Sequence, residues 1–315
     1  MFGKIIYSLS LMVFIVLLFL VWILFYQTYL SENIPFQVLN KQGLPIISNI
    51  SGQEDYPQGM MFYENLRFKK SVISYSIDSS CDETRANDAI TAFNIIDNST
   101  IIDFVERESG EIFVSCSLET PPQIDERHFI AGEGGPTSIV NATNFNVILN
   151  GTILLYEDSD CQNPIVAIHE ILHALGFRHS SNKNSIMYPI ANCKQQITPE
   201  IIEKIDSLYS YPTLPDLVIT RVDAVKKGFL LDFTVTIMNV GLDKSDSSTL
   251  YVYHGDKEVF DYDVGALDFG VGKVVSTKNT KIFGSSNNLT FIADKNNDIN
   301  EISESNNIQV LVLKE

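Results

Sequence analysis

The sequence predicts an α+β chain in three parts: a transmembrane helix, a domain of strands and helices, and an all-β sandwich. An uncharged apolar run near the N-terminus predicts the first part. A histidine motif on a helical segment, with strand-like segments before it, predicts the second. Strand-like segments without a convincing helix fill the last third and predict the third part. A length of 315 residues suits two folded domains besides a membrane segment.

The apolar run at residues 5–26 has no charged side chain and is rich in Leu, Ile, Val and Phe. It exceeds the roughly 20 residues that cross a bilayer. A cleaved signal peptide has an apolar core of about 7–15 residues and a small-residue cleavage site. This run is longer, and no Ala-x-Ala follows it. We therefore expect an uncleaved anchor at residues 5–27.

The charges near the run predict its orientation. Lys4 and the terminal amine favour a cytoplasmic stub at residues 1–4. The protein is then expected in the cell membrane as a single-pass protein, with everything after the anchor outside the cytoplasm. Residues 28–67 show no sustained period and are expected to form a stalk or a short pro-segment.

The overall charge excludes one class of partner. A formal net charge of -17 argues against nucleic acid, whose phosphates attract basic surfaces.

The four cysteines are consistent with an external location, because an even set in such a region suggests two disulfides. Four cysteines allow three pairings, and the sequence alone does not choose among them. The pairing we favour joins Cys81 to Cys116 and Cys161 to Cys193.

The most informative stretch is His-Glu-Ile-Leu-His-Ala-Leu-Gly-Phe-Arg-His, from His169 to His179. His169 and His173 are four residues apart, so on a helix they lie one turn above each other and can bind one metal ion. Gly176 can end the helix at positive φ and let the chain bring His179 back as a third ligand. Three neutral imidazoles suit zinc and leave a fourth position for water, beside Glu170. A structural zinc site would not need Glu170 and would usually close with a fourth protein ligand.

The full His-Glu-x-x-His-x-x-Gly-x-x-His pattern, followed by Ser-Ile-Met-Tyr-Pro at residues 185–189, resembles the metzincin zinc peptidases and within them the matrixin-like branch. The resemblance implies a twisted mixed sheet with helices, one catalytic zinc ion and hydrolysis of peptide bonds. It also implies that Glu170 is the general base and that Met187 supports the zinc ligands from below. Pro189 stands where some metzincins have a ligating tyrosine, so Tyr188 is not expected to bind the metal.

The matrixin-like domain is expected at residues 68–211, and patterns along it predict its elements. Alternation predicts strands, helical spacing predicts helices, and Asn150-Gly151 predicts a hairpin. Residues 132–136 are expected to be a loop. Asn163 is expected to cap the helix that carries the histidines, and Thr198 to cap the last helix. The expected strands are 71–78, 100–105, 111–117 and two pieces of 145–156, with helices at 82–97, after 163 and after 198.

Residues 213–315 are expected to form the sandwich, of Ig-like type, because several short strands follow one another with turn signals. The pattern resembles the cell-adhesion-related (CARDB) domains of prokaryotic surface proteins. From that resemblance, we expect a surface protein or a glycan as the partner of this domain. The residues that carry it are Asn239-Val240-Gly241, Asp294, Asn297, Ile299, Glu301, Glu304, Asn306 and Asn307.

The acidic loop in this domain begins like an EF-hand. Its alternating oxygen-bearing side chains are Asp294, Asn296, Asp298 and Asn300. Ile299 stands where the EF-hand needs glycine, and Ser305 where it needs glutamate. We therefore favour a polar hairpin for this loop. Calcium is left open as a cofactor, and the sequence gives no support for it. His254 is expected to be exposed, and so is His128.

The function predicted from these patterns is a membrane-anchored, extracytoplasmic zinc metalloendopeptidase that acts on protein or peptide substrates. The alternative is a surface adhesion or binding protein with an inactive or regulatory metzincin fold. A zinc-dependent amidase acting on cell-wall peptides would share the chemistry and differ in substrate.

Overall fold

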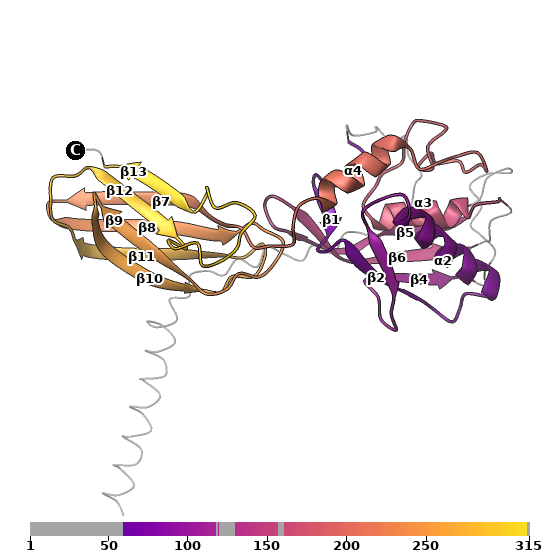
Figure 1. Ribbon diagram of the computed structural model, residues 1–315, viewed down its shortest axis with the longest axis horizontal. Helices are drawn as coiled ribbons and strands as arrows, with labels where there is room; N and C mark the ends of the chain where they lie inside the picture. The colour runs from indigo at the N-terminus through magenta and orange to yellow at the C-terminus, as the bar shows by residue number, and fades with distance from the viewer. Residues whose placement is uncertain (1–58, 118, 120–129, 157–160, 314–315) are drawn as a thin grey trace, which may run out of the picture. The chain divides into compact units, whose positions relative to one another are not determined.

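The computed structural model describes residues 59–117, 119, 130–156 and 161–313 (Figure 1). Within these ranges, no helix is long and apolar enough to cross a membrane. The predicted anchor at 5–27, the stub at 1–4, residues 28–58 of the predicted stalk and His128 lie outside the described residues.

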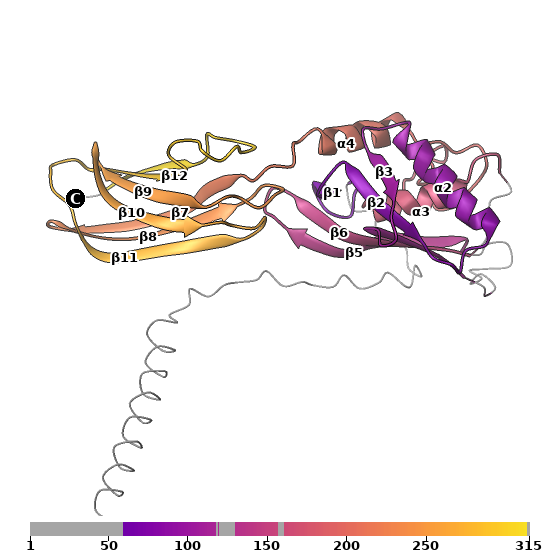
Figure 2. The same ribbon diagram turned by 60° about the horizontal axis from the view of Figure 1, so that its bottom comes forward.

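The first domain is built on one mixed sheet. β1, β6, β4, β2 and β3 follow one another in parallel, and β5 runs antiparallel along β6, as Figure 2 shows. β1 begins two residues before the predicted start of the domain. The strands are β1 (Leu66–Phe68), β2 (Val72–Ile77), β3 (Asp103–Glu106), β4 (Ile112–Cys116), β5 (Gly132–Asn141) and β6 (Asn146–Leu155).

Three helices of the described chain belong to this domain: α2 (Glu83–Asp97), α3 (Ile165–Ala174) and α4 (Pro199–Tyr209). α2 begins after Asp82, whose side chain accepts a hydrogen bond from the backbone N–H of Arg85. α4 begins after Thr198 with proline in its first turn, as predicted, but the Thr198 side chain makes no cap hydrogen bond. The buried faces of the helices and the sheet form one apolar core.

Two predictions for this sheet were wrong. Residues 132–136 are not a loop but the first half of β5, and β6 runs straight through Asn150-Gly151 without a hairpin turn. The physical reason is close packing against α3. A Cβ at Gly134 would lie 2.3 Å from the carbonyl oxygen of Glu170, and one at Gly151 would lie 3.3 Å from the Cβ of Ala174. These glycines serve the approach of a helix, not a turn.

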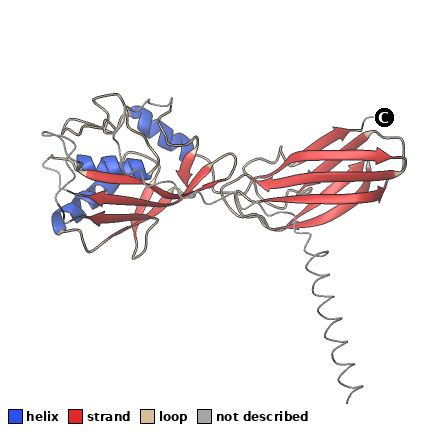
Figure 3. Cartoon of the chain, turned by 180° about the vertical axis from the view of Figure 1, so that it is seen from behind, coloured by secondary structure: helices blue, strands red, loops and turns tan. Residues whose placement is uncertain are grey.

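The second domain consists of two sheets, and Figure 3 shows no helix in the described part of this domain. One sheet has the order β10-β9-β12-β13 and the other β11-β8-β7. Apolar side chains of both sheets form a single core. The strands are β7 (Leu217–Lys227), β8 (Leu230–Asn239), β9 (Ser248–His254), β10 (Lys257–Gly265), β11 (Gly272–Lys281), β12 (Asn288–Ala293) and β13 (Ile308–Val312).

The expectation for His254 was wrong, because its side chain is buried. Its two ring nitrogens lie 3.3 Å from the carbonyl oxygen of Phe283 and 2.6 Å from that of Ser286. It therefore holds the β11–β12 connection to β9.

Both disulfides of the favoured pairing are present, so that prediction is confirmed. Cys81–Cys116 joins the chain just before α2 to the end of β4. Cys161–Cys193 joins the chain just before α3 to the segment between residue 189 and α4.

Candidate active site

α3 carries two of the predicted ligands and packs on the sheet. Ile168, Leu172 and Leu175 lie in the core, as their spacing predicts. The helix begins one residue later than predicted: Pro164 is its N-cap residue and makes no side-chain cap hydrogen bond. Gly176, at φ +98°, takes the left-handed conformation after the helix and turns the chain back.

The structure brings the three predicted histidines together. Nε2 of His173 lies 3.1 Å from Nε2 of His179. The ring centroids of His169 lie 4.6 Å and 5.2 Å from those of His173 and His179. One nitrogen from each ring can be chosen so that all three lie within 4.8 Å of one another. A single ion could therefore contact all three.

Backbone carbonyls orient the two helical imidazoles. Nδ1 of His169 lies 2.6 Å from the carbonyl oxygen of Ile186, and Nδ1 of His173 lies 2.8 Å from that of Phe177. Because a carbonyl oxygen only accepts, each Nδ1 must be the protonated donor. Each Nε2 is therefore left with a lone pair.

Burial keeps these rings neutral. Burial is the largest cause: with the neighbouring imidazoles, and against the opposing effect of the backbone hydrogen bonds, it lowers the pKa of His169 to about 4 and that of His173 well below its ordinary value. A metal ligand must be the neutral imidazole, so the environment favours the ligating form.

The donor set fits zinc. Nε2 of His173 bears a lone pair, is buried and faces a third imidazole at 3.1 Å. Three imidazole nitrogens that converge on one point are a donor set that zinc prefers. The side chains of the three histidines supply the whole set. No fourth His, Cys, Asp or Glu of the described residues joins the group.

Glu170 belongs to α3, and its side chain packs against the first residues of β5. It is 6% exposed, and a Cβ at Gly132 would lie 3.0 Å from its Oε1. Burial, followed by the charge of Glu133, raises the pKa of Glu170 to about 8. A carboxyl group in such surroundings binds a proton far more tightly than in water.

The turn at residues 185–189, which contains Met187, follows the three histidines in the chain. Met187 is buried in the same core as α3, and its carbonyl oxygen accepts a hydrogen bond from the N–H of Ser180. Ser185 accepts a hydrogen bond from the N–H of Met187. The carbonyl of Ile186, in the same turn, is the partner of His169, so the turn contacts the histidine site directly.

Glu133, on β5, was not among the predicted site residues. Its carboxylate accepts a hydrogen bond from the Tyr156 hydroxyl at 3.0 Å, and its charge acts on Glu170. No motif marks it. Residues 132–136 were expected to be a loop. Only their pairing with β6, as part of β5, brings Glu133 beside α3.

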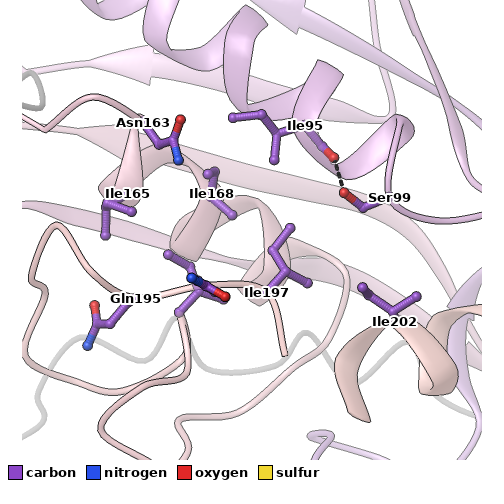
Figure 4. A pocket seen from close by; sticks show the side chains of 10 residues that line it. Ile95, Ser99, Asn163, Ile165, Ile168, Gln195, Ile197 and Ile202 are labelled. Atoms are coloured by element: carbon purple, nitrogen blue, oxygen red, sulfur yellow. Dashed lines mark hydrogen bonds between the residues drawn. The ribbon is translucent and has the colours of Figure 1, made fainter. Parts of the chain in front are cut away.

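A separate open cavity of about 200 Å³ lies between α2, α3 and the segment that precedes α4 (Figure 4). Isoleucines dominate its lining, and none of the three histidines contributes to it. Because it contains no ionisable side chain, it offers no catalytic group.

Comparison with known families matches both domains. The family model described as Matrixin matches residues 67–210, and the one described as CARDB matches residues 214–310. Matrix metalloproteinase-20 of Homo sapiens is 25% identical over 200 residues, which is 55% of this chain. The match spans only 38% of that relative.

Two solved structures resemble the second domain. The CARDB domain of a Pyrococcus furiosus protein, determined in complex with di-metal ions, is 22% identical with a TM-score of 0.28 and covers 32% of this chain and 88% of its own. A domain of a putative cell surface protein from Methanosarcina acetivorans is 28% identical with a TM-score of 0.29, covering 32% and 94%.

Proposed function

We propose that this protein is a zinc-dependent endopeptidase. The chain contains a matrixin domain at residues 67–210 and a CARDB domain at residues 214–310. The matrixin domain supports a metallopeptidase in general. The observation that carries the finer proposal is the convergence of His169, His173 and His179, with the buried carboxyl of Glu170 directly after His169 on α3.

The three imidazoles would hold zinc through neutral nitrogens. When bound, zinc supplies Lewis acidity to the attacking water and to the scissile carbonyl. Glu170 takes the proton of that water and passes it to the nitrogen of the leaving amine. Burial and the charge of Glu133 raise the pKa of Glu170 to about 8, which makes its carboxylate a stronger base. The positive charge of bound zinc would lower this pKa and favour the carboxylate form that accepts the proton.

β5 is the strand we propose for substrate binding. Among the described strands it pairs only with β6, so its other edge is open to an extended peptide. Gly132 and Gly134 bring this strand against Glu170, which places the open edge near the proposed base. The substrate class is therefore protein or peptide in an extended conformation.

The proposed location is the outer side of the cell membrane. The uncharged run at 5–27 would anchor the chain, and two disulfides favour an oxidising compartment. The CARDB domain would bind a surface protein or a glycan and so bring the peptidase to its substrate.

The test uses the full chain loaded with zinc and an unfolded protein as substrate. We expect one zinc ion per chain and cleavage that a chelator or a hydroxamate blocks. Glu170→Ala should keep its zinc and lose activity by at least about 10²-fold, because the proton acceptor is gone. Glu203→Ala, at an exposed position of α4, is the control and should leave both unchanged.

Other results would decide against the proposal. Undiminished turnover in Glu170→Ala would exclude the mechanism. Bound zinc without cleavage would favour the adhesion protein with an inactive fold, and cleavage confined to cell-wall peptides would favour the amidase.

A further inference from the structure

A group of three carboxylates lies in the loop between β12 and β13, in the second domain. One oxygen of each of Asp294, Glu301 and Glu304 lies within 4.8 Å of the other two. Asp294 and Glu301 are only 7% and 6% exposed, and Glu304 is open to solvent. Three negative groups at this distance repel one another strongly when two of them are out of water.

Backbone N–H groups hold these carboxylates in place without neutralising them. Asp294 accepts from the N–H of Asp298 at 3.2 Å and from that of Ile299 at 2.9 Å. Glu304 accepts from the N–H of Glu301 at 3.2 Å.

Glu301 itself accepts a hydrogen bond from the N–H of Leu217. No ion pair of the described residues involves Asp294, Glu301 or Glu304. Burial, with the charges of Glu304 and Asp294, raises the pKa of Glu301 to about 7. The loop thus fixes the oxygens and lacks the opposite charge that burial normally requires.

A second, independent observation is an oxygen without a partner. Asn307 is 2% exposed, and its Nδ2 donates to Oε1 of Glu301 at 2.9 Å. Its Oδ1 has no hydrogen-bond partner among the described atoms. Oδ1 is bonded to the same carbon as Nδ2, which contacts Oε1 of Glu301, so the unpaired oxygen lies within about 5 Å of that carboxylate oxygen. A buried acceptor without a donor is rare and calls for a ligand or an ion.

We propose that this loop binds one hard divalent cation of the Ca²⁺ class, through the carboxylates of Asp294, Glu301 and Glu304 and the amide oxygen of Asn307. Every donor is oxygen, which selects Ca²⁺ over the metals that prefer imidazole or thiolate. The site uses none of Asn296, Asp298 and Asn300, so it is not the EF-hand-like pattern. It is independent of the proposed peptidase function.

Occupancy of this site would also stabilise the start of the domain. Glu301 holds the first residue of β7, Leu217, and the N–H of Ile302 donates to the carbonyl of Pro215 at 2.9 Å. The cation would fix the loop that makes these contacts. We therefore expect the amide protons of Leu217 and Ile299 to exchange more slowly when Ca²⁺ is bound.

The experiment is calorimetric titration of the zinc-loaded full chain with CaCl₂, at constant ionic strength. We expect one saturable site per chain and a rise of about 5 °C or more in the unfolding temperature of the second domain at saturating Ca²⁺. Glu304→Gln should weaken Ca²⁺ at least tenfold, because it removes a ligand charge. It should leave the fold intact, since its amide oxygen can still accept from Glu301. Asp256→Asn removes the same charge at an exposed turn and should bind as the unchanged chain does.

Two outcomes would overturn the proposal. One is the absence of saturable Ca²⁺ binding by the unchanged chain, and the other is equal affinity in Glu304→Gln. Hydrogen exchange of the unchanged chain tests the proposal without a variant. If the amide protons of Leu217 and Ile299 exchange equally fast with and without Ca²⁺, the proposed Ca²⁺ site is contradicted.

Discussion

At the scale of single residues, the three candidate ligands could be predicted and the orientation of their rings could not. The spacing of His169, His173 and His179 follows from helix geometry and a glycine, so the sequence was enough to name them. The carbonyls of Ile186 and Phe177, which set the tautomers, belong to the backbone and carry no side-chain signal. Any residue could stand at those two positions and present the same oxygen.

Gly134 gives a residue-scale prediction with a matched control next to it. Gly134→Ala should destabilise the first domain by about 1–3 kcal/mol, because its Cβ would meet backbone atoms of Glu170, the nearest at 2.3 Å. β5 would have to move away from α3, so the proposed peptidase activity should fall as well. Gly135→Ala places its Cβ where no atom lies within 4 Å and should be nearly neutral. Thermal unfolding of the two variants checks this, and equal unfolding temperatures would contradict it.

At the scale of helices and strands, the sequence predicted best where one face is apolar and the other polar. β2 and α2 each have one buried and one polar face, and the predicted ranges 71–78 and 82–97 contain them. β10 is mostly exposed, so it has no buried face to produce such a pattern. The glycines of β5 and β6 were interpreted as turns because their packing partner, α3, lies elsewhere in the sequence.

Asp82 gives an element-scale prediction about pH. Hydrogen bonds from the backbone and side chain of Arg85 lower the pKa of Asp82 below its ordinary value of 3.8. A lowered folded-state pKa means that the stabilisation is present above about pH 4 and is lost as pH falls through the folded-state pKa. Asp82→Asn can still cap α2 but does not titrate. The unfolding temperature of the variant should therefore fall less than that of the unchanged chain between pH 5 and pH 2, about a few degrees less.

Two measurements would decide this prediction. Denaturation curves of both proteins across that pH range give the difference directly. Parallel curves would show that the cap does not depend on the charge of Asp82.

At the scale of the whole chain, the two large cores contain different residues. The first core takes its residues from β1–β6 and α2–α4, and the second from β7–β13 with nearby loops. A ligand that binds only one domain stabilises that domain by mass action. The histidine site and the acidic loop should therefore report separately on two unfolding steps.

Zinc removal tests this separation. A zinc-selective chelator should lower the unfolding temperature of the matrixin domain by about 5 °C or more and leave the CARDB domain unchanged. Scanning calorimetry with and without added zinc resolves the two steps. A shift of both steps by the same amount would show that the domains unfold as one unit.

The disulfide between Cys161 and Cys193 closes a covalent ring of backbone that contains α3, His179 and Met187. A single cut of the backbone inside that ring, by any protease, cannot release either piece. A nicked molecule should therefore run at full length on a non-reducing gel and separate into two fragments once a reductant is added. Fragments that separate without reductant would show that the ring is not closed in the native protein.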